Sequence, residues 1–434
     1  MAVCISLSGL ASAVAREGGI GVIAATAIGM LEPDYFRNGV EANRRALRRE
    51  IQRARELGAR ALGVNIMVAA SDFDSLLRVS LEEKVDVVFL GAGLPIKGIP
   101  VRDLRRAGVK VVPIVSSDRA ARLIFSHWRK NHGDIPDGVV VEGPLAGGHL
   151  GFRPEQIDDP AFSLDNLVPR VVEVMGEFEK ESGRRLPVIA AGGVFDGRDI
   201  DRFLGLGAGG VQLGTRFVAT HECDADERFK ASFVAAGRDD LTIIRSPVGL
   251  PGRALDSPFL RRVASGENRP FGCPWQCLAS CNARQANYCI SMALYHARKG
   301  NLEKGFAFAG ANAFRVKQVV SVGELLTQLK AEFVVTVESR ILSLSAEYEK
   351  ALARFKTIRK ETRDRLRAIR REYREKLKRR QDSLVEDYHR SLRKIEALKG
   401  DYAAYCERLK VIAAQLEEII KGTTLYPSTL NGSV

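Results

Sequence analysis

The sequence of 434 residues has no hydrophobic run that approaches the length of a membrane span, which needs about 18 consecutive apolar residues. It also has no positively charged segment before its first apolar residues, as a secretory leader would have. The seven cysteines, an odd number in a long chain, do not fit the disulfide framework of a small secreted protein. We therefore expect a cytoplasmic protein with no membrane span.

Glycine and proline are absent from residues 338–399, although the whole chain has 40 Gly and 16 Pro. In their place, apolar residues recur every three or four positions from Ile341 to Ile395, with charged residues between them. This pattern predicts a long amphipathic helix or coiled coil. We expect a second helix at 402–419 after Gly400, so the helical extension covers 338–421 and a flexible tail covers 422–434.

The positive charge of the chain is concentrated at the same end. The net charge is +13, and residues 338–434, with 23 Lys and Arg against 15 Asp and Glu, carry +8 of it. The densest basic stretch, 363–380, has interleaved acidic residues and Tyr373 as its one aromatic residue, so it offers no platform for stacking bases. We expect this helix to join copies of the chain or to bind a partner helix, and we do not expect nucleic acid as its partner. The alternative is a solvated helix face with no partner.

The first half of the chain alternates short apolar runs with helical segments. Because the runs are almost continuously apolar, they predict parallel strands covered on both faces. Repeated strand–helix units predict an α/β fold, here a (β/α)8 TIM barrel that lacks its first strand, since the chain begins with a helix at 7–17. We assign 1–245 to the barrel and 246–337 to a cysteine-containing helical cap. The predicted strands are 19–26, 61–68, 85–93, 110–117, 138–143, 187–193 and 210–217.

Two of these strands end in glycine-bearing loops, at Gly192-Gly193 and at Gly214-Thr215. If the missing first strand is counted, these are the loops after the seventh and eighth strands. In such barrels, the loops at these positions often bind phosphate through backbone N–H groups. Glycine lets the backbone approach the anion, and the Thr215 hydroxyl can add a hydrogen bond. The alternative is that both loops are only tight turns.

One histidine stands out from the six in the chain. His149 follows the strand at 138–143 and lies in the glycine-rich segment 146–151, where the backbone can approach a ligand closely. An imidazole there can act as a general acid or base, or contact the substrate. Asn65 ends another strand and can offer its amide to a ring-shaped cofactor, or it is simply a turn residue.

These segments together resemble the nitronate monooxygenase (2-nitropropane dioxygenase) family. The resemblance rests on Gly-Val-Asn at 63–65, Ala-Gly-Gly-His-x-Gly at 146–151, Ala-Ala-Gly-Gly at 190–193 and Gln-x-Gly-Thr-Arg-Phe at 212–217. It implies an FMN-dependent TIM barrel, in a family that includes flavin-dependent enoyl-acyl-carrier-protein reductases. It further implies that His149 faces the substrate and that the flavin is bound by Asn65, Glu142, Gly147, Gly148, Gly192, Gly193, Gln212, Leu213, Gly214 and Thr215.

The resemblance implies an enzyme, for which there are two hypotheses, and the missing first strand adds a third hypothesis without catalysis. The first is a nitronate monooxygenase that oxidises alkyl nitronates with O2 to a carbonyl compound and nitrite. The second is an NAD(P)H-dependent enoyl reductase, which Glu142 followed by Gly143 favours, because nitronate monooxygenases tend to have Gln at this position. The third is a non-catalytic scaffold that carries the coiled coil, since the family's opening strand is not seen.

Four cysteines are crowded into 17 residues, at Cys273, Cys277, Cys281 and Cys289. Four thiolates can hold an iron–sulfur cluster or zinc. The spacing matches neither the ferredoxin run nor a pair of CxxC motifs, so the alternative is that these residues pack as small free thiols.

Overall fold

The computed structural model describes residues 3–267, 271–273, 276–279, 281–397, 413–415 and 417–418. The chain divides into two compact units, Met1–Ile341 and Leu342–Val434. The first unit contains the predicted barrel and the predicted cap together. None of the described helices is both long and apolar enough to cross a membrane.

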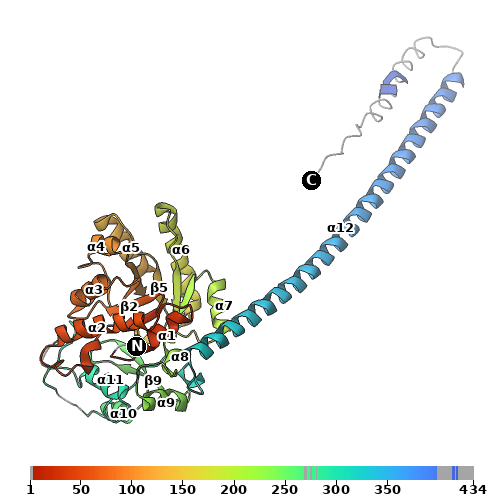
Figure 1. Ribbon diagram of the computed structural model, residues 1–434. Coiled ribbons are helices and arrows are strands. Elements are labelled where there is room, and N and C mark those ends of the chain that lie inside the picture. Colours follow the sequence, from red (N-terminus) through yellow and green to blue (C-terminus); the bar gives the residue numbers. More distant parts are fainter. Residues whose placement is uncertain are drawn as a thin grey trace. The chain divides into compact units, whose positions relative to one another are not determined.

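A seven-stranded parallel sheet forms the centre of the first unit. Its strands lie side by side in the order in which they occur in the chain, and β6, which belongs to another sheet, is not among them. This confirms the predicted α/β fold, a barrel-like curled sheet (Figure 1). The strands β1 and β8 are its two end strands, and the described residues supply no further strand between them. The strands are β1 (Gly21–Ala24), β2 (Leu62–Met67), β3 (Val87–Gly91), β4 (Lys110–Val115), β5 (Val139–Glu142), β7 (Val188–Ala191) and β8 (Gly210–Gln212).

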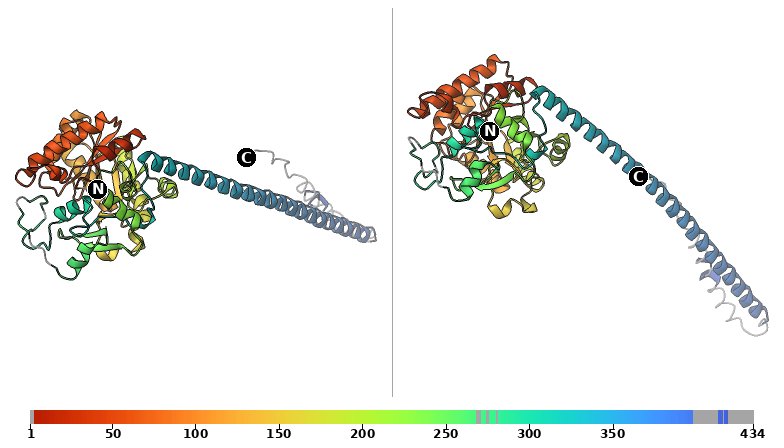
Figure 2. Two further views of the ribbon diagram at one scale, coloured as in Figure 1. Left: turned by 60° about the horizontal axis from the view of Figure 1, so that its bottom comes forward. Right: turned by 90° about the horizontal axis from the view of Figure 1, so that it is seen from below.

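Helices cover the outside of this sheet (Figures 1 and 2). Buried apolar side chains fill its inside. The inner core contains Val87, Phe89, Val112, Val140 and Ala191, all buried. The covering helices are α1 (Ser8–Arg16), α2 (Gly39–Glu56), α3 (Phe73–Glu82), α4 (Val101–Ala107), α5 (Asp118–His132), α6 (Leu164–Ser182), α7 (Gly197–Gly205) and α8 (Thr215–Val218). Single 3-10 turns lie at Ile28–Leu31, Pro154–Gln156, Pro160–Phe162 and Ala313–Arg315.

The segment before α1 follows the outer edge of β1. The Val3 N–H donates to the Thr26 carbonyl at 3.2 Å, and the Ala24 N–H donates to the Ser6 carbonyl at 3.0 Å. Residues 3–6 therefore supply backbone partners to part of an edge that would otherwise lack them.

A second, antiparallel sheet of three strands, which we call the cap sheet, has the order β6–β10–β9. Its strands are β6 (Gly148–His149), β9 (Leu241–Arg245) and β10 (Pro251–Leu255), of which only β10 lies within the predicted cap, 246–337. The sequence analysis did not predict this sheet. The helices of this part of the chain are α9 (Glu227–Ala235), α10 (Pro258–Ala264) and α11 (Ile290–Arg298). The sheet holds His149 opposite Gly252.

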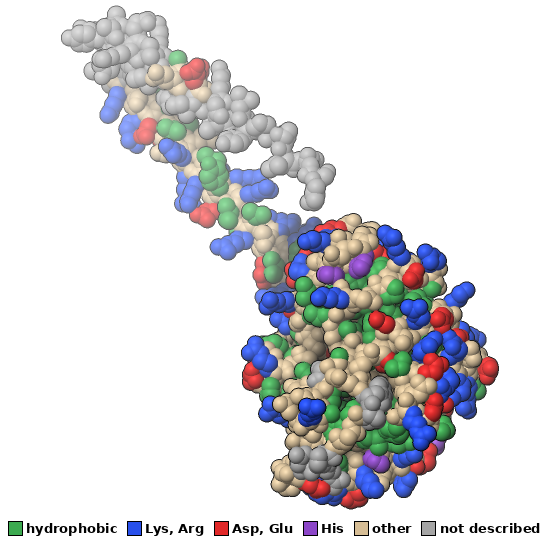
Figure 3. All heavy atoms as spheres, turned by 90° about the vertical axis from the view of Figure 1, so that its left-hand side faces the viewer, with side chains coloured by type: hydrophobic (Ala, Val, Ile, Leu, Met, Phe, Trp, Pro, Cys, Tyr) green, Lys and Arg blue, Asp and Glu red, His purple; other side chains and the backbone are tan. Residues whose placement is uncertain are grey.

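Helix α12 (Val322–Ala397) is continuous over 76 residues. It begins well before residue 338, so the end of the predicted cap and the start of the predicted extension belong to one helix. Its first turns are anchored in the barrel unit through Val322, Leu325 and Leu329, which are buried. In the second unit its apolar side chains are exposed among basic ones (Figure 3), for example Leu342 at 71% and Tyr348 at 65%. The helix predicted at 402–419 and the tail at 422–434 lie almost entirely outside the described residues.

Candidate active site

Three polar side chains stand at the carboxyl ends of barrel strands, on the inward-facing positions. They are Asn65, Glu142 and Gln212. Asn65 lies on β2 opposite Ala24 and Phe89. Glu142 of β5 and Gln212 of β8 lie on either side of Ala191 of β7, which pairs with both. Successive strand residues point to opposite faces, so Glu142 shares the inner face with Val140 of the core. This end of the sheet is where barrel enzymes place their chemistry.

Glu142 is half-buried, and none of the hydrogen bonds found among the described side chains involves it. Removal from bulk water disfavours the charged carboxylate and raises the pKa of Glu142 from 4.5 to about 7. The carboxyl group can therefore hold or release a proton near neutral pH.

The glycines of the loop after β7 are required by its backbone conformation. Gly192 and Gly193 both have φ of +91°, in the left-handed region that side chains rarely adopt. A Cβ atom on Gly192 would lie 2.8 Å from the Gly143 carbonyl oxygen, and one on Gly147 would lie 2.5 Å from the carbonyl carbon of Ala309. The loops after β5 and β7 thus approach each other and the 309–312 segment at backbone distance.

The segment 309–312 links these loops. Its contacts with them were not predicted from the sequence. The Asn312 side-chain amide donates to the Gly193 carbonyl at 2.6 Å, and the Gly310 N–H donates to the Thr215 hydroxyl oxygen at 2.9 Å. The Ala311 N–H donates to the Leu145 carbonyl at 3.0 Å. The Thr215 oxygen is thus already an acceptor, which leaves its hydroxyl hydrogen for a ligand.

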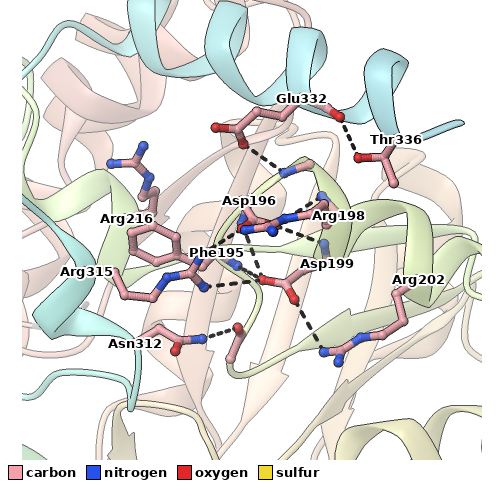
Figure 4. Close-up of polar contacts among 12 residues, drawn as sticks. Phe195, Asp196, Arg198, Asp199, Arg202, Arg216, Asn312, Arg315, Glu332 and Thr336 are labelled. Atoms are coloured by element: carbon pink, nitrogen blue, oxygen red, sulfur yellow. Dashed lines mark hydrogen bonds and ion pairs between the residues drawn. The ribbon is translucent and has the colours of Figure 1, made fainter. Parts of the chain in front are cut away.

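A charged network fixes the far end of the β7 loop (Figure 4). The Asp196 carboxylate accepts from the Arg198 and Asp199 N–H groups that open α7, and it pairs with Arg315 at 2.6 Å. Burial alone would raise the pKa of Asp196, but hydrogen bonds from Arg198 and Arg315 lower it to about 2. The Phe195 ring lies under the guanidinium groups of Arg216, at 4.7 Å, and Arg315, at 4.1 Å.

Helix α12 also contacts this loop. The Glu332 carboxylate accepts from the Gly197 N–H at 3.0 Å, and a Cβ on Gly197 would lie 2.2 Å from the Phe333 nitrogen. The first turns of α12 therefore support the loop that carries Gly193.

His149 is held by the cap sheet rather than by the barrel. Its Nε2 lies 2.7 Å from the Ser246 Oγ, and its ring makes an edge contact with Phe308 at 5.1 Å between centroids. Removal from water lowers the pKa of His149 to about 4, so the ring is neutral at pH 7. Ser246 was not predicted as a functional residue, because nothing in the sequence shows that its side chain contacts His149.

The loops suit an anionic cofactor such as FMN. The backbone N–H groups of Gly193, Gly214 and Thr215 enter none of the hydrogen bonds among the described loops, and so are available to a phosphate. Arg253 donates to the Pro144 carbonyl at 3.0 Å, while its Nε is buried with no partner among the described residues. This positive group suits a negatively charged ligand nearby. Gly148, with φ of +92°, opens β6, and Leu213 packs on the core beside Gly214.

The cysteines give a different result. Cys277, Cys281 and Cys289 are half-buried near α11, where the Cys277 sulfur lies 3.4 Å from the Ser291 hydroxyl, and Cys273 is exposed. Within the described parts of the chain, no three His, Cys, Asp or Glu side chains are arranged to hold a metal ion. The iron–sulfur or zinc site therefore stays a prediction of the sequence.

Comparison with known proteins identifies the family of this chain. The family model for nitronate monooxygenase matches residues 1–332. The chain belongs to the nitronate monooxygenase family. This family segment contains Asn65, Glu142, His149, both glycine loops and the cap, and it ends within the first turns of α12.

Named relatives of this nitronate monooxygenase family member have different activities. A nitronate monooxygenase of Paraburkholderia phytofirmans is 29% identical over 61% of this chain and 65% of its own length. A (3aS,4S,5R,7aS)-5-hydroxy-7a-methyl-1-oxo-octahydro-1H-indene-4-carboxyl-CoA dehydrogenase of Rhodococcus jostii is 28% identical over 60% of this chain and 62% of its own. The structure of FabK from Thermotoga maritima is similar with a TM-score of 0.60 and 32% identity, over 77% of this chain and 91% of that one. The chain thus spans slightly over three-fifths of the length of the Paraburkholderia and Rhodococcus relatives.

Proposed function

We propose that this protein is an FMN-dependent oxidoreductase that oxidises alkyl nitronates with O2 to a carbonyl compound and nitrite. The observation that carries the proposal is the neutral imidazole of His149, which lies in the segment after β5 that packs against Gly192 of the glycine loops suited to a phosphate. When bound, FMN supplies the electron transfer between substrate and O2.

The residues divide into three roles in this proposal. Gly192, Gly193, Gly214 and Thr215 hold the phosphate through backbone N–H groups and one hydroxyl. Asn65, Glu142, Gly147, Gly148, Gln212 and Leu213 surround the ring and the chain that joins it to the phosphate. His149 binds the substrate and orients its oxygen atoms.

The test is the absorption spectrum of the purified protein, followed by oxygen uptake with an alkyl nitronate. We expect a bound flavin, nitronate-dependent oxygen consumption and the release of nitrite. His149→Ala should lower this activity at least about 100-fold, while His127→Ala, on the exterior helix α5, should leave it unchanged. Flavin-loaded protein that does not consume oxygen with any nitronate contradicts the proposal.

NAD(P)H-dependent reduction of enoyl thioesters is the second candidate. It is favoured by Glu142-Gly143 at the end of β5 and by the 32% identity to FabK. Oxidation of NADH or NADPH that depends on an enoyl thioester and needs no O2 distinguishes it from nitronate oxidation. Colourless protein that does not bind added FMN would instead support the scaffold hypothesis.

We propose that a second copy of the chain covers the exposed apolar residues of α12. Basic and acidic residues alternate beside them and pair along the helix, as between Lys376 and Glu372 at 2.7 Å. Sedimentation of the full chain and of a chain ending at residue 341 tests this. We expect a dimer that becomes a monomer on truncation, and a monomeric full-length chain would contradict the proposal.

A further inference from the structure

The Arg216 guanidinium is a positive charge beside the glycine loops that no carboxylate of the described chain pairs with. Arg216 follows Gly214 and Thr215 directly, in the first turn of α8. It is half-buried, and its Nε is shielded from solvent without a hydrogen-bond partner among the described residues. The hydrogen bond that it does form, from Nη2 to the Gln328 Oε1 at 3.1 Å, ends on a neutral amide. Removal from water lowers the pKa of Arg216, and the nearby Glu332 carboxylate offsets this only in part.

The neighbouring arginines differ from Arg216 because their charges are balanced within the protein. Arg315 pairs with the Asp196 carboxylate at 2.6 Å, and Arg198 pairs with the same carboxylate at 2.9 Å. A cation that is removed from water without a counterion is costly, and an anion placed nearby reduces that cost. Arg216 is therefore the member of this network that a bound anion would stabilise.

The Phe195 ring connects Arg216 to the other glycine loop. Phe195 comes two residues after Gly193, at the end of the loop that follows β7. The guanidinium carbon of Arg216 lies 4.7 Å from the ring centroid and that of Arg315 lies 4.1 Å from it (Figure 4). Cations are attracted to the faces of aromatic rings. Arg216 thus belongs to one glycine loop and contacts the residue that ends the other.

Two side chains of α12 hold the guanidinium group in this position. The Gln328 Nε2 donates to the Glu332 carboxylate at 2.8 Å, which leaves the Gln328 Oε1 as the acceptor for Arg216. The other oxygen of Glu332 accepts from the Gly197 N–H at 3.0 Å. A chain of hydrogen bonds therefore runs from the start of α7 through α12 to Arg216.

We propose that Arg216 supplies the positive charge that attracts the phosphate of a bound flavin, and that Phe195, Gln328 and Glu332 are positioning residues for this charge. The inference rests on the proposed function for its cofactor and is independent of the substrate. The charge acts through space and its effect grows with the negative charge of the ligand. Arg216 should therefore determine how strongly the site prefers FMN to riboflavin, which has the same ring and ribityl chain but no phosphate. The first turns of α12 then contribute to flavin binding.

The test compares FMN with riboflavin in fluorescence titrations of the flavin-free full chain. We expect the wild type to bind FMN more tightly. Arg216→Gln should lower the ratio of the two affinities about tenfold and change the affinity for riboflavin less than about twofold. Arg216→Lys keeps the charge and should retain the ratio within about threefold. Gln328→Leu keeps the guanidinium group but removes its acceptor, and should lower the ratio about threefold.

Arg129→Gln is the matched control. Arg129 also lies over a phenylalanine ring, that of Phe178 at 5.2 Å, but it is on the exterior helix α5 and pairs with Glu181. It should leave both affinities unchanged.

Two results for Arg216→Gln would overturn the inference: an unchanged ratio, or equal losses of affinity for FMN and riboflavin, which would show that Arg216 only supports the fold. If Arg216→Gln does not fold, a tenfold lower ratio in Arg216→Lys would overturn it, because the charge is still present. Protein that binds neither flavin would contradict the proposed function and this inference together. If flavin-loaded protein oxidises no nitronate, the proposed function fails, and the two affinities still decide the role of Arg216.

Discussion

Replacing Glu142 by Gln should make the protein increasingly more stable than the wild type as the pH rises from 5 to 7. In the unfolded chain this carboxyl group loses its proton near pH 4.5, but in the folded protein its pKa is about 7 because burial disfavours the charge. Between these values the folded state binds more protons than the unfolded state, so the wild type loses stability as the pH rises. The amide of the Glu142→Gln variant does not titrate, so the variant avoids this loss.

The size of the effect follows from the two pKa values. A change from 4.5 to about 7 corresponds to a ceiling of about 3 kcal/mol. Because Glu142 is half-buried and open to the site, we expect about 1–2 kcal/mol, reached near pH 7 and constant above it. For a unit of this size that is a difference of a few degrees in Tm.

Thermal unfolding followed by tryptophan fluorescence measures this difference, because Trp128 is fully buried in the barrel unit. Melts of both proteins at matched flavin content from pH 5 to 9 should give Tm curves that separate with pH. Glu177→Gln is the control: this exposed residue pairs with Arg122, which lowers the pKa of Glu177, so its difference curve should be flat or of opposite sign. Parallel curves for Glu142→Gln and wild type would refute the account of Glu142.

Three further predictions concern the loops and the cysteines. Gly193→Ala forces a side chain into φ of +91°, with its Cβ 3.0 Å from Leu145. It should weaken FMN binding at least about tenfold in a fluorescence titration. The control is Gly183→Ala, which has φ of +68° and open space around it and should leave FMN binding unchanged. Asn312→Ala removes the hydrogen bond to the Gly193 carbonyl and should raise the Kd for FMN about five- to tenfold, and an unchanged Kd would remove Asn312 from the site. If the four clustered cysteines bind a metal, anaerobically purified protein should contain stoichiometric iron and sulfide, or zinc, that Cys277→Ser lacks, and metal-free protein would leave them as packing thiols.

The strands of the barrel were predictable because their cause is local. Parallel strands covered on both faces need continuous apolar runs, and the structure has a strand within each of the seven predicted ranges. The cap sheet was not predictable in this way. Its strand β6 has only two residues, Gly148 and His149, which is too short for any periodic pattern. It is defined by pairing with β10, about a hundred residues later.

Some residues of the candidate site could likewise be predicted from the sequence, and others could not. Asn65, Glu142 and the glycine pairs lie at strand ends, and their positions could be read from the sequence. The roles of Ser246 and Asn312 could not be read in this way. Ser246 contacts His149, 97 residues away in the chain, and Asn312 contacts Gly193, 119 residues away. Their backbone turns are recognisable, but only tertiary packing shows which residue each turn reaches.

Helix α12 combines an anchored segment and an exposed segment, which the sequence analysis separated at residue 338. Its first turns bury Val322, Leu325 and Leu329 in the barrel unit and cap the N-terminal end of α7 through Glu332. The family match ends at residue 332, so these turns belong to the family fold, whereas the exposed apolar residues after Ile341 do not. Burial of the first turns stabilises the barrel unit, and exposure of the later ones contributes nothing to it. Truncation after residue 341 should therefore remove the exposed segment and leave the anchored turns in place, although no loop interrupts the helix.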